Sequence, residues 1–404
     1  MAKLAVLMVT AFVDMVGLFL ILPLLPFYAT RLSDEGVLAK LLQSIGLGGT
    51  GFVVAVLVSS FAVAQLLSAP LWGRISDRYG RRPALLVGLA AAAIAYVVFA
   101  FADSLDLLFL SRIVQGAGGG TVGVIQAYVA DATEPKNRAK SLGWLSAATN
   151  AGVAIGPAIG AFAAKLGPAA PGLAAAALTL LNMLFAWRFL VESRVVAPAG
   201  SATRPRVKAS VAVRRVVSHS GEPASRLIWI YAIAMGAFHM TTAVLALFLA
   251  LRFDVDEDTI GFFFTYIGVI SVVTRAGVLG WAVDRFGEVR LSRIGTVLLS
   301  LGLATIPLTY HLGPLALAVA LVPLGTAFTF PCVTALLSRV IASDERGLYM
   351  GVQQSFGGMA RVAAPLFGGW AYDALGPGVP FWVGAAMVLG TLALGLGMER
   401  YATS

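Results

Sequence analysis

The chain of 404 residues has little charge and almost no cysteine or histidine. Only 12% of its residues are charged, about half the share of a soluble globular domain, so an ordinary soluble domain is excluded. One cysteine, Cys332, leaves no internal disulfide and no thiolate metal site. The three histidines are scattered, and the sequence contains no HExxH, GxSxG or Walker A motif. We therefore expect no enzyme, no bound metal or other cofactor, and no direct use of ATP.

Apolar residues dominate instead, at 59% of the chain, together with 44 glycines. Glycines allow close helix approach in membrane bundles, and the unbroken apolar runs differ from the alternating segments of a transmembrane barrel. Runs of about 20 residues are long enough to cross a bilayer as helices. They predict twelve spans, near 4–28, 50–72, 83–102, 107–130, 140–164, 170–190, 226–250, 259–282, 291–310, 313–337, 347–371 and 378–398.

The loops between these runs differ in charge. Basic residues gather on one side, for example in the 73–82 and 284–290 loops, whereas acids such as Asp34 and Asp256 lie on the other. The positive-inside rule makes the basic side cytoplasmic and, with an even number of spans, puts both termini there. The placement of basic residues in loops on one side of the membrane accounts for the net charge of +9. Binding of nucleic acid would instead need a basic face on a soluble domain. We expect an integral protein of a bacterial inner membrane.

A polar, basic stretch from Val191 to Ser225 divides the chain near its midpoint. It predicts a cytoplasmic linker, with an amphipathic helix around 207–217 as one possibility because its arginines would meet anionic lipid. The predicted domains are residues 1–190, the linker 191–225, and residues 226–404.

The two halves repeat. The segment GRISDRYGRR (73–82) returns as GWAVDRFGEV 207 positions later, and the Gly156-Pro157 segment returns as Ala364-Pro365 208 positions later. Two matches at nearly one offset indicate a duplicated six-helix unit. Parallel six-span halves are one known transporter architecture.

The 73–82 loop resembles the G-x-x-x-D-R-x-G-R-R signature of the major facilitator superfamily. Its glycines suit a helix end and a tight turn. The resemblance implies a latch on the cytoplasmic side, with Asp131 as the acid that pairs with the loop arginines. A simple positively charged topology loop is the alternative. The latch residues so implied are Gly73, Asp77, Arg78, Gly80, Arg81, Arg82, Asp131, Asp284 and Arg285, the last two in the second copy, which we expect to be weaker because Glu288 replaces Arg81.

The fifth span contains glycines at every fourth position together with a proline: Gly152, Gly156, Pro157 and Gly160. This spacing places the glycines on one helix face. The pattern resembles the Gly-Pro motif of antiporters in this superfamily, which implies export. Ordinary small-residue packing is the alternative.

The first span carries a lone acid, Asp14, at a cost of roughly 2.5–3.5 kcal/mol near a helix centre. The segment around it resembles the first span of twelve-span drug/proton antiporters, including the tetracycline exporters. The fourth span holds Arg112 within R-x-x-Q-G, which resembles the segment of a buried arginine associated with proton transfer. Burial favours the neutral form of a carboxyl group, and a nearby guanidinium such as that of Arg112 favours the charged form. If Asp14 alternates between two such surroundings, it can bind and release a proton. The alternative is a structural role for Asp14 and for Arg112. His239, in the seventh span, is a further titratable candidate.

One departure concerns the substrate. The third and ninth spans contain no acid, although tetracycline exporters carry functional aspartates there, so tetracycline is not the default substrate. Arg275 and Arg361 are each a substrate counter-charge, a partner for helix carbonyls or a snorkelling group. The residues predicted to line the cavity are Gln126, Asn150, Phe238, Gln353 and Arg361.

Together these observations predict an all-α membrane protein of two pseudo-symmetric six-helix bundles with the major facilitator fold. We expect a monomer, driven by the proton gradient and surrounded by membrane lipids, that exports a small lipophilic compound by alternating access. A proton symporter or facilitator for a metabolite, a non-transporting receptor and a lipid scramblase on the same fold are the alternatives.

Overall fold

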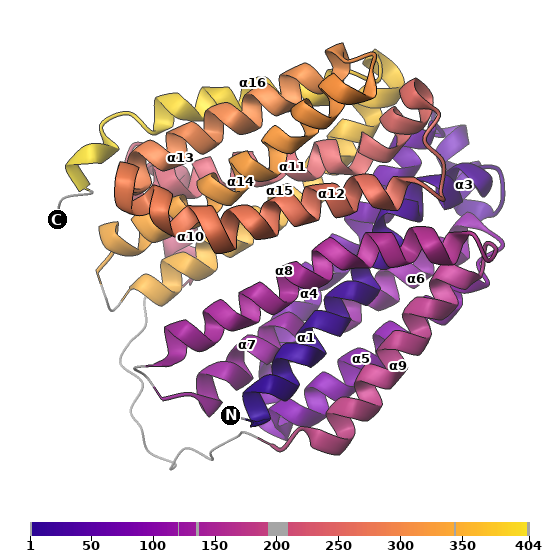
Figure 1. Cartoon of the computed structure of the whole chain (residues 1–404), viewed down its shortest axis with the longest axis horizontal. Coiled ribbons are helices and arrows are strands. Elements are labelled where there is room, and N and C mark those ends of the chain that lie inside the picture. The colour runs from indigo at the N-terminus through magenta and orange to yellow at the C-terminus, as the bar shows by residue number, and fades with distance from the viewer. Residues whose placement is uncertain (1, 120, 135–136, 193–208, 343–344, 402–404) are drawn as a thin grey trace. The chain divides into compact units, whose positions relative to one another are not determined.

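The structure is a computed structural model that describes residues 2–119, 121–134, 137–192, 209–342 and 345–401. Every regular element within these ranges is helical (Figure 1). This result agrees with the all-α prediction. The part of the predicted linker between residues 193 and 208 lies outside the described residues.

The N-terminal half of the chain begins with a helix that is interrupted at Pro23 by a 3₁₀ turn. Its elements are α1 (Ala2–Ile21), η1 (Leu22–Leu24), α2 (Leu25–Arg31), α3 (Val37–Ser44), α4 (Thr50–Tyr79), α5 (Arg81–Ala100), α6 (Leu105–Gly118), α7 (Thr121–Ala132), α8 (Arg138–Ala164) and α9 (Ala170–Phe189).

The C-terminal half opens with a short helix inside the predicted linker. Its elements are α10 (Ala209–Ser218), α11 (Pro223–Phe253), α12 (Ile260–Val273), the π-helical turn η3 (Thr274–Val278), α13 (Leu279–Thr305), η4 (Ile306–Leu308), α14 (Leu312–Val340), α15 (Arg346–Leu375), α16 (Val379–Leu394) and η5 (Met398–Tyr401).

Nine described segments are long and apolar enough to cross a membrane, and the chain is an integral membrane protein. One of them, Ile260–Leu308, has 49 residues and contains the predicted eighth and ninth spans. Helix α15, in the predicted eleventh span, has 30 residues but is not among the nine, and α16 is a shorter apolar helix. The total of twelve spans therefore stays a prediction.

The predicted span near 107–130 lies within the candidate membrane segment Leu105–Ala132. This segment consists of two helices, because α6 ends at Gly118, beside Gly116 and Gly119, and α7 begins at Thr121. Glycine is a poor helix former. Inside α13, Gly287 adopts φ +73°, and Gly80, 207 positions earlier, adopts φ +106° between α4 and α5. The repeated loop thus has the same left-handed glycine in both copies.

The chain forms two compact units, residues Met1–Ala197 with Leu249–Val272, and Pro198–Phe248 with Val273–Ser404. In the first unit α1 packs against both α8 and α9, while α4 and α5 pack against α6 (Figure 1). In the second unit α13 packs against α14 and α16. The candidate proton site lies in the interior of the first unit.

Candidate functional site

Asp14 lies in the middle of α1 and is only 9% exposed. Its carboxylate Oδ2 accepts a hydrogen bond from the hydroxyl of Thr121 at 3.0 Å. Thr121 is the first residue of α7, and the positive end of a helix dipole stabilises a nearby anion. The break between α6 and α7 therefore places two compensating groups, a hydroxyl and a helix end, beside the buried acid.

Side chains of α4 satisfy the backbone at this break. Gln65 Nε2 donates to the carbonyl of Gly119 at 3.2 Å, and Ser68 Oγ donates to the carbonyl of Gly116 at 3.4 Å. Trp72 Nε1 donates to the carbonyl of Ala117 at 2.5 Å. Irregular backbone within a membrane needs such partners, because hydrocarbon offers none. The side chains of α4 therefore stabilise the break between α6 and α7.

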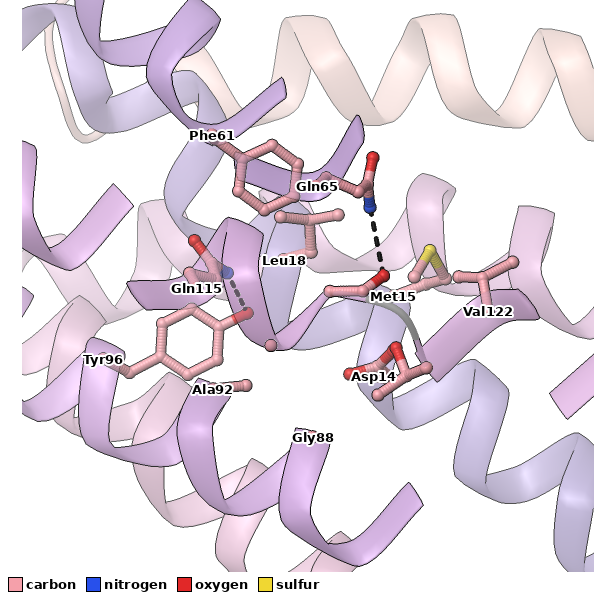
Figure 2. Close-up of a pocket in the computed structure, with 13 residues that line it drawn as sticks. Asp14, Met15, Leu18, Phe61, Gln65, Gly88, Ala92, Tyr96, Gln115 and Val122 are labelled. Atoms are coloured by element: carbon pink, nitrogen blue, oxygen red, sulfur yellow. Dashed lines mark hydrogen bonds between the residues drawn. The ribbon is translucent and has the colours of Figure 1, made fainter. Parts of the chain in front are cut away.

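Tyr96 lines the same small cavity as Asp14. Gln115 Nε2 donates to the Tyr96 hydroxyl at 2.6 Å, and the charges of both Asp14 and Arg112 act on this tyrosine. The side chains enclose a small cavity of about 30 Å³, which is enough for a water molecule (Figure 2). Its lining consists of Asp14, Met15, Leu18, Phe61, Gln65, Gly88, Ala92, Tyr96, Gln115, Gly118, Gly119, Thr121 and Val122.

Arg112, in α6, is 2% exposed and lies over the ring of Phe99, with 5.4 Å from Cζ to the centroid. Its Nε and Nη2 atoms have no hydrogen-bond partner among the residues that the structure describes, and no ion pair joins it to Asp14 there. Asp14 and Arg112 are therefore not in direct contact among the described residues, and both lie within electrostatic reach of Tyr96. A guanidinium cannot lose its proton under ordinary conditions, so Asp14 is the group of this site that can exchange one.

The segment 73–82 was predicted as a loop with a helix end at Gly73, but α4 continues through Gly73 to Tyr79, and only Gly80 separates it from α5. This segment, which we continue to call the 73–82 loop, is organised around Arg81. Its Nη1 atom lies 2.7 Å from Asp77 Oδ1 and its Nε donates to Asp131 Oδ2 at 3.0 Å. Arg81 also donates to the Ser76 hydroxyl at 2.7 Å. Arg78 lies over the ring of Tyr79, and Gly73 has open space where a Cβ would stand. Asp77 thus contacts an arginine of its own loop.

Glu192 is an acid that sequence reasoning missed. Its carboxylate accepts the backbone N–H groups of Arg81 (2.9 Å) and Arg82 (3.1 Å) and so caps the N-terminus of α5. A Cβ on Gly80 would lie 2.4 Å from this carboxylate. The only sign of this contact in the sequence was the presence of an acid at the start of the linker, and it lies 110 positions from Arg82.

The second copy of the loop contains a pair of opposite polarity. Glu288, which occupies the position of Arg81, pairs with Arg339 at the end of α14. Asp284 and Arg285 are both exposed. The ion pair between the loop and a neighbouring helix end thus occurs in both copies, with the charges exchanged.

The three glycines of α8 lie against the backbone of α1. A Cβ on Gly152, Gly156 or Gly160 would approach a backbone oxygen of α1 to 2.5, 2.7 or 2.1 Å. Pro157 lies on a neighbouring face, where a Cβ on Gly261 of α12 would approach its carbonyl to 2.1 Å. Helix α8 is therefore packed closely against two helices of the first unit.

The predicted cavity residues lie in different environments. Gln353 is fully buried, and Thr334 donates to its Oε1 at 3.4 Å, whereas Gln126 is exposed. The side-chain amide of Asn150 donates to the carbonyl of Ser146 at 2.6 Å. The remaining two, Phe238 and Arg361, are half-buried in the second unit, as is His239, the titratable candidate.

The class of protein follows from these observations. A helical membrane chain with repeated halves, close helix seams and a buried carboxyl beside a cavity is a secondary transporter in architecture. The comparison with known families is consistent with this. The model of the Major Facilitator Superfamily matches residues 7–277 and 227–402, and the chain belongs to that superfamily.

The chain is also similar to individual transporters of known sequence or structure. The chain is 30% identical to the class C tetracycline resistance protein of Escherichia coli, over 99% of this chain and 98% of that protein. It is 27% identical to multidrug resistance protein 1 of Bacillus subtilis (strain 168), covering 98% and 95%. The human organic anion transporter MFSD10 superposes with a TM-score of 0.73 at 25% identity, covering 98% and 99%. Proteins of this superfamily are transporters of small molecules and need no cofactor. This chain is therefore a transporter of small molecules.

Proposed function

We propose that this transporter exports small lipophilic compounds in exchange for protons. The observation that carries the proposal is Asp14, a lone acid buried in a membrane-spanning helix beside a polar cavity. Such a residue is costly and is functional by default. The names of the relatives, tetracycline and multidrug resistance proteins, support export as the direction.

In the proposed cycle, Asp14 takes a proton from the periplasmic side as substrate leaves, and releases it to the cytoplasm as substrate loads. The hydroxyl of Thr121 and the N-terminus of α7 stabilise the charged carboxylate. Burial favours the neutral form. A change of packing around α1 and α7 between the two states of the transporter would shift this balance and so couple proton transfer to alternating access.

The cytoplasmic loop supplies the second part of the proposal. Arg81 holds together the loop, through Asp77, and the end of α7, through Asp131. We assign to this cluster the role of a latch that must open and close in each cycle. The proposal further includes twelve spans, the domain boundaries 1–190, 191–225 and 226–404, cytoplasmic termini, an inner-membrane location and a monomer.

The proposed function is tested by efflux from bacterial cells that lack their own major exporters. Cells expressing the wild type should accumulate less of at least some compounds in a panel of lipophilic antibiotics and dyes of both charges. Asp14→Asn should raise accumulation to the level of cells without the protein. The control is Asp103→Asn, an exposed acid in the loop before α6, which should leave efflux unchanged. Wild-type efflux by the Asp14 variant, at equal expression, would contradict the proposal.

A further inference from the structure

A groove lies between the neighbouring helices α13 and α16 of the second unit, which pack against each other (Figure 1). Its volume is about 430 Å³, which falls within the range of roughly 300–1,000 Å³ for pockets that hold small molecules. The lining residues are Arg293, Ile294, Val297, Leu298, Leu392 and Leu396. Arg293 comes first among those of α13, so the groove has a charged group at one end and aliphatic side chains along the rest.

The aliphatic wall of this groove is partly exposed. Ile294 is 40% exposed, Val297 37% and Leu396 63%. The α13 part of the wall belongs to the membrane segment Ile260–Leu308, and α16 is an apolar helix. Because lipid tails are as apolar as leucine, this wall is suited to a hydrocarbon chain.

Two arginines converge on the C-terminal end of α16. Arg293 Nη2 donates to the carbonyl of Gly395 at 2.7 Å, and Arg226 Nε, from α11, donates to the carbonyl of Leu394 at 2.6 Å. Basic side chains commonly bind the last carbonyls of a helix in this way. Since the two carbonyls are consecutive, both guanidinium groups lie at the same end of the groove.

This end of the groove carries more basic than acidic groups. Arg290 stands three residues before Arg293 on α13, which puts both on one helix face, and it is exposed. Glu399 of η5 pairs with Arg293 Nη1. The side chain of Arg293 is still 31% exposed, and a guanidinium has five N–H donors, so its contacts with Gly395 and Glu399 do not use all of them. Three guanidinium groups against one carboxylate leave a net positive charge.

We propose that this groove binds an anionic phospholipid, with the phosphate at Arg293 and an acyl chain along the aliphatic wall. The planar fork of N–H donors on an arginine matches a phosphate group. Basic pockets between membrane helices are known to bind anionic head groups. A zwitterionic lipid has the same chains but brings no net negative charge, so the groove distinguishes the two kinds of lipid. The inference does not depend on export or on Asp14.

Native mass spectrometry of the full chain, released from detergent micelles, measures this preference. The probes are dioleoylphosphatidylglycerol, which is anionic, and dioleoylphosphatidylcholine, which is zwitterionic. The first molecule of the anionic lipid should bind at least roughly tenfold more tightly than the zwitterionic one. Arg293→Gln should weaken its binding by roughly 10- to 100-fold, the range for a lost charge-assisted hydrogen bond, and leave the zwitterionic lipid unaffected. Glu399→Gln removes a competing negative charge and should strengthen it.

A second variant leaves every charge in place. Val297→Trp fills part of the aliphatic groove and should also weaken binding of the anionic lipid. The matched control is Arg346→Gln, an exposed arginine at the start of α15, which should bind like the wild type.

Three results would overturn the proposal. The first is equal binding of the two lipids by the wild type, and the second is an equal loss in Arg293→Gln and Arg346→Gln. The third is displacement of the lipid by glycerophosphoglycerol, the head group without chains, together with unchanged binding in Val297→Trp, because the site would then hold a free phosphate group.

Discussion

At the residue scale, the buried acid was predictable and its surroundings were not. Asp14 and Arg112 stand out because each interrupts an apolar run. Thr121, Tyr96 and Gln115 carry no such signal, since a hydroxyl or an amide in a helix is common and their grouping depends on how three helices pack. The absence of an ion pair between Asp14 and Arg112 within the described chain could likewise not be predicted from the sequence.

The hydroxyl of Thr121 gives the first prediction. Thr121→Val keeps the shape of the side chain but removes the donor to Asp14, and a hydrogen bond to a charged group contributes about 1.5–3 kcal/mol. We expect proton-driven efflux to fall by roughly tenfold or more. Thr121→Ser, which retains a hydroxyl, should keep most of the activity. Equal efflux by the valine and serine variants would show that the hydroxyl has no part in coupling.

At the element scale, the spacing of the glycines predicted that they share one face of α8, but not which helix packs against that face. The four-residue repeat of glycines placed them on one side of α8, and the structure shows that this side lies against α1. The charge-reversed pair Glu288–Arg339 is a contact that the sequence motif did not predict. The sequence predicts a weaker latch in the second copy, because the complementary change from Asp131 to Arg339 lies outside the motif.

The glycine seam can be tested with two glycines of the same helix. Gly160→Ala would place a Cβ only 2.1 Å from the backbone oxygen of Leu20, whereas a Cβ on Gly143 would meet no atom within 4 Å. Overpacking typically costs about 1–3 kcal/mol, so Gly160→Ala should lower the thermal unfolding temperature of the purified protein. Gly143→Ala should leave it unchanged or raise it slightly, as alanine is the better helix former. Equal stability of the two variants would rule out a tight α1–α8 seam.

At the scale of the whole molecule, the repeat predicted the fold well, while the contacts of α12 came only from the structure. Although α12 follows the linker in sequence, it groups with the first unit, and Gly268 stands where a Cβ would lie 2.5 Å from Ala154 of α8. Phe162 and Phe262 meet across the same seam, with ring centroids 5.6 Å apart. Alternating access by rocking of the two halves requires this seam to open.

A reversible crosslink tests that requirement. Phe162→Cys with Phe262→Cys, in a Cys332→Ala background without other cysteines, would be joined by a short reducible bis-thiosulfonate reagent. Efflux should stop on crosslinking and return on reduction. The control pair, Phe185→Cys with Phe189→Cys, lies along α9 alone, with ring centroids 5.2 Å apart, and its crosslink should not affect efflux. Full activity of the crosslinked α8–α12 pair would show that the seam stays closed during transport.

The central claim is that Asp14 exchanges its proton for substrate. It is tested most directly by adding a transported compound to the purified protein in weakly buffered solution and recording the pH. The wild type should release protons in proportion to the compound bound, and Asp14→Asn should bind the compound without releasing protons. Equal proton release by the wild type and the Asp14 variant would contradict the account.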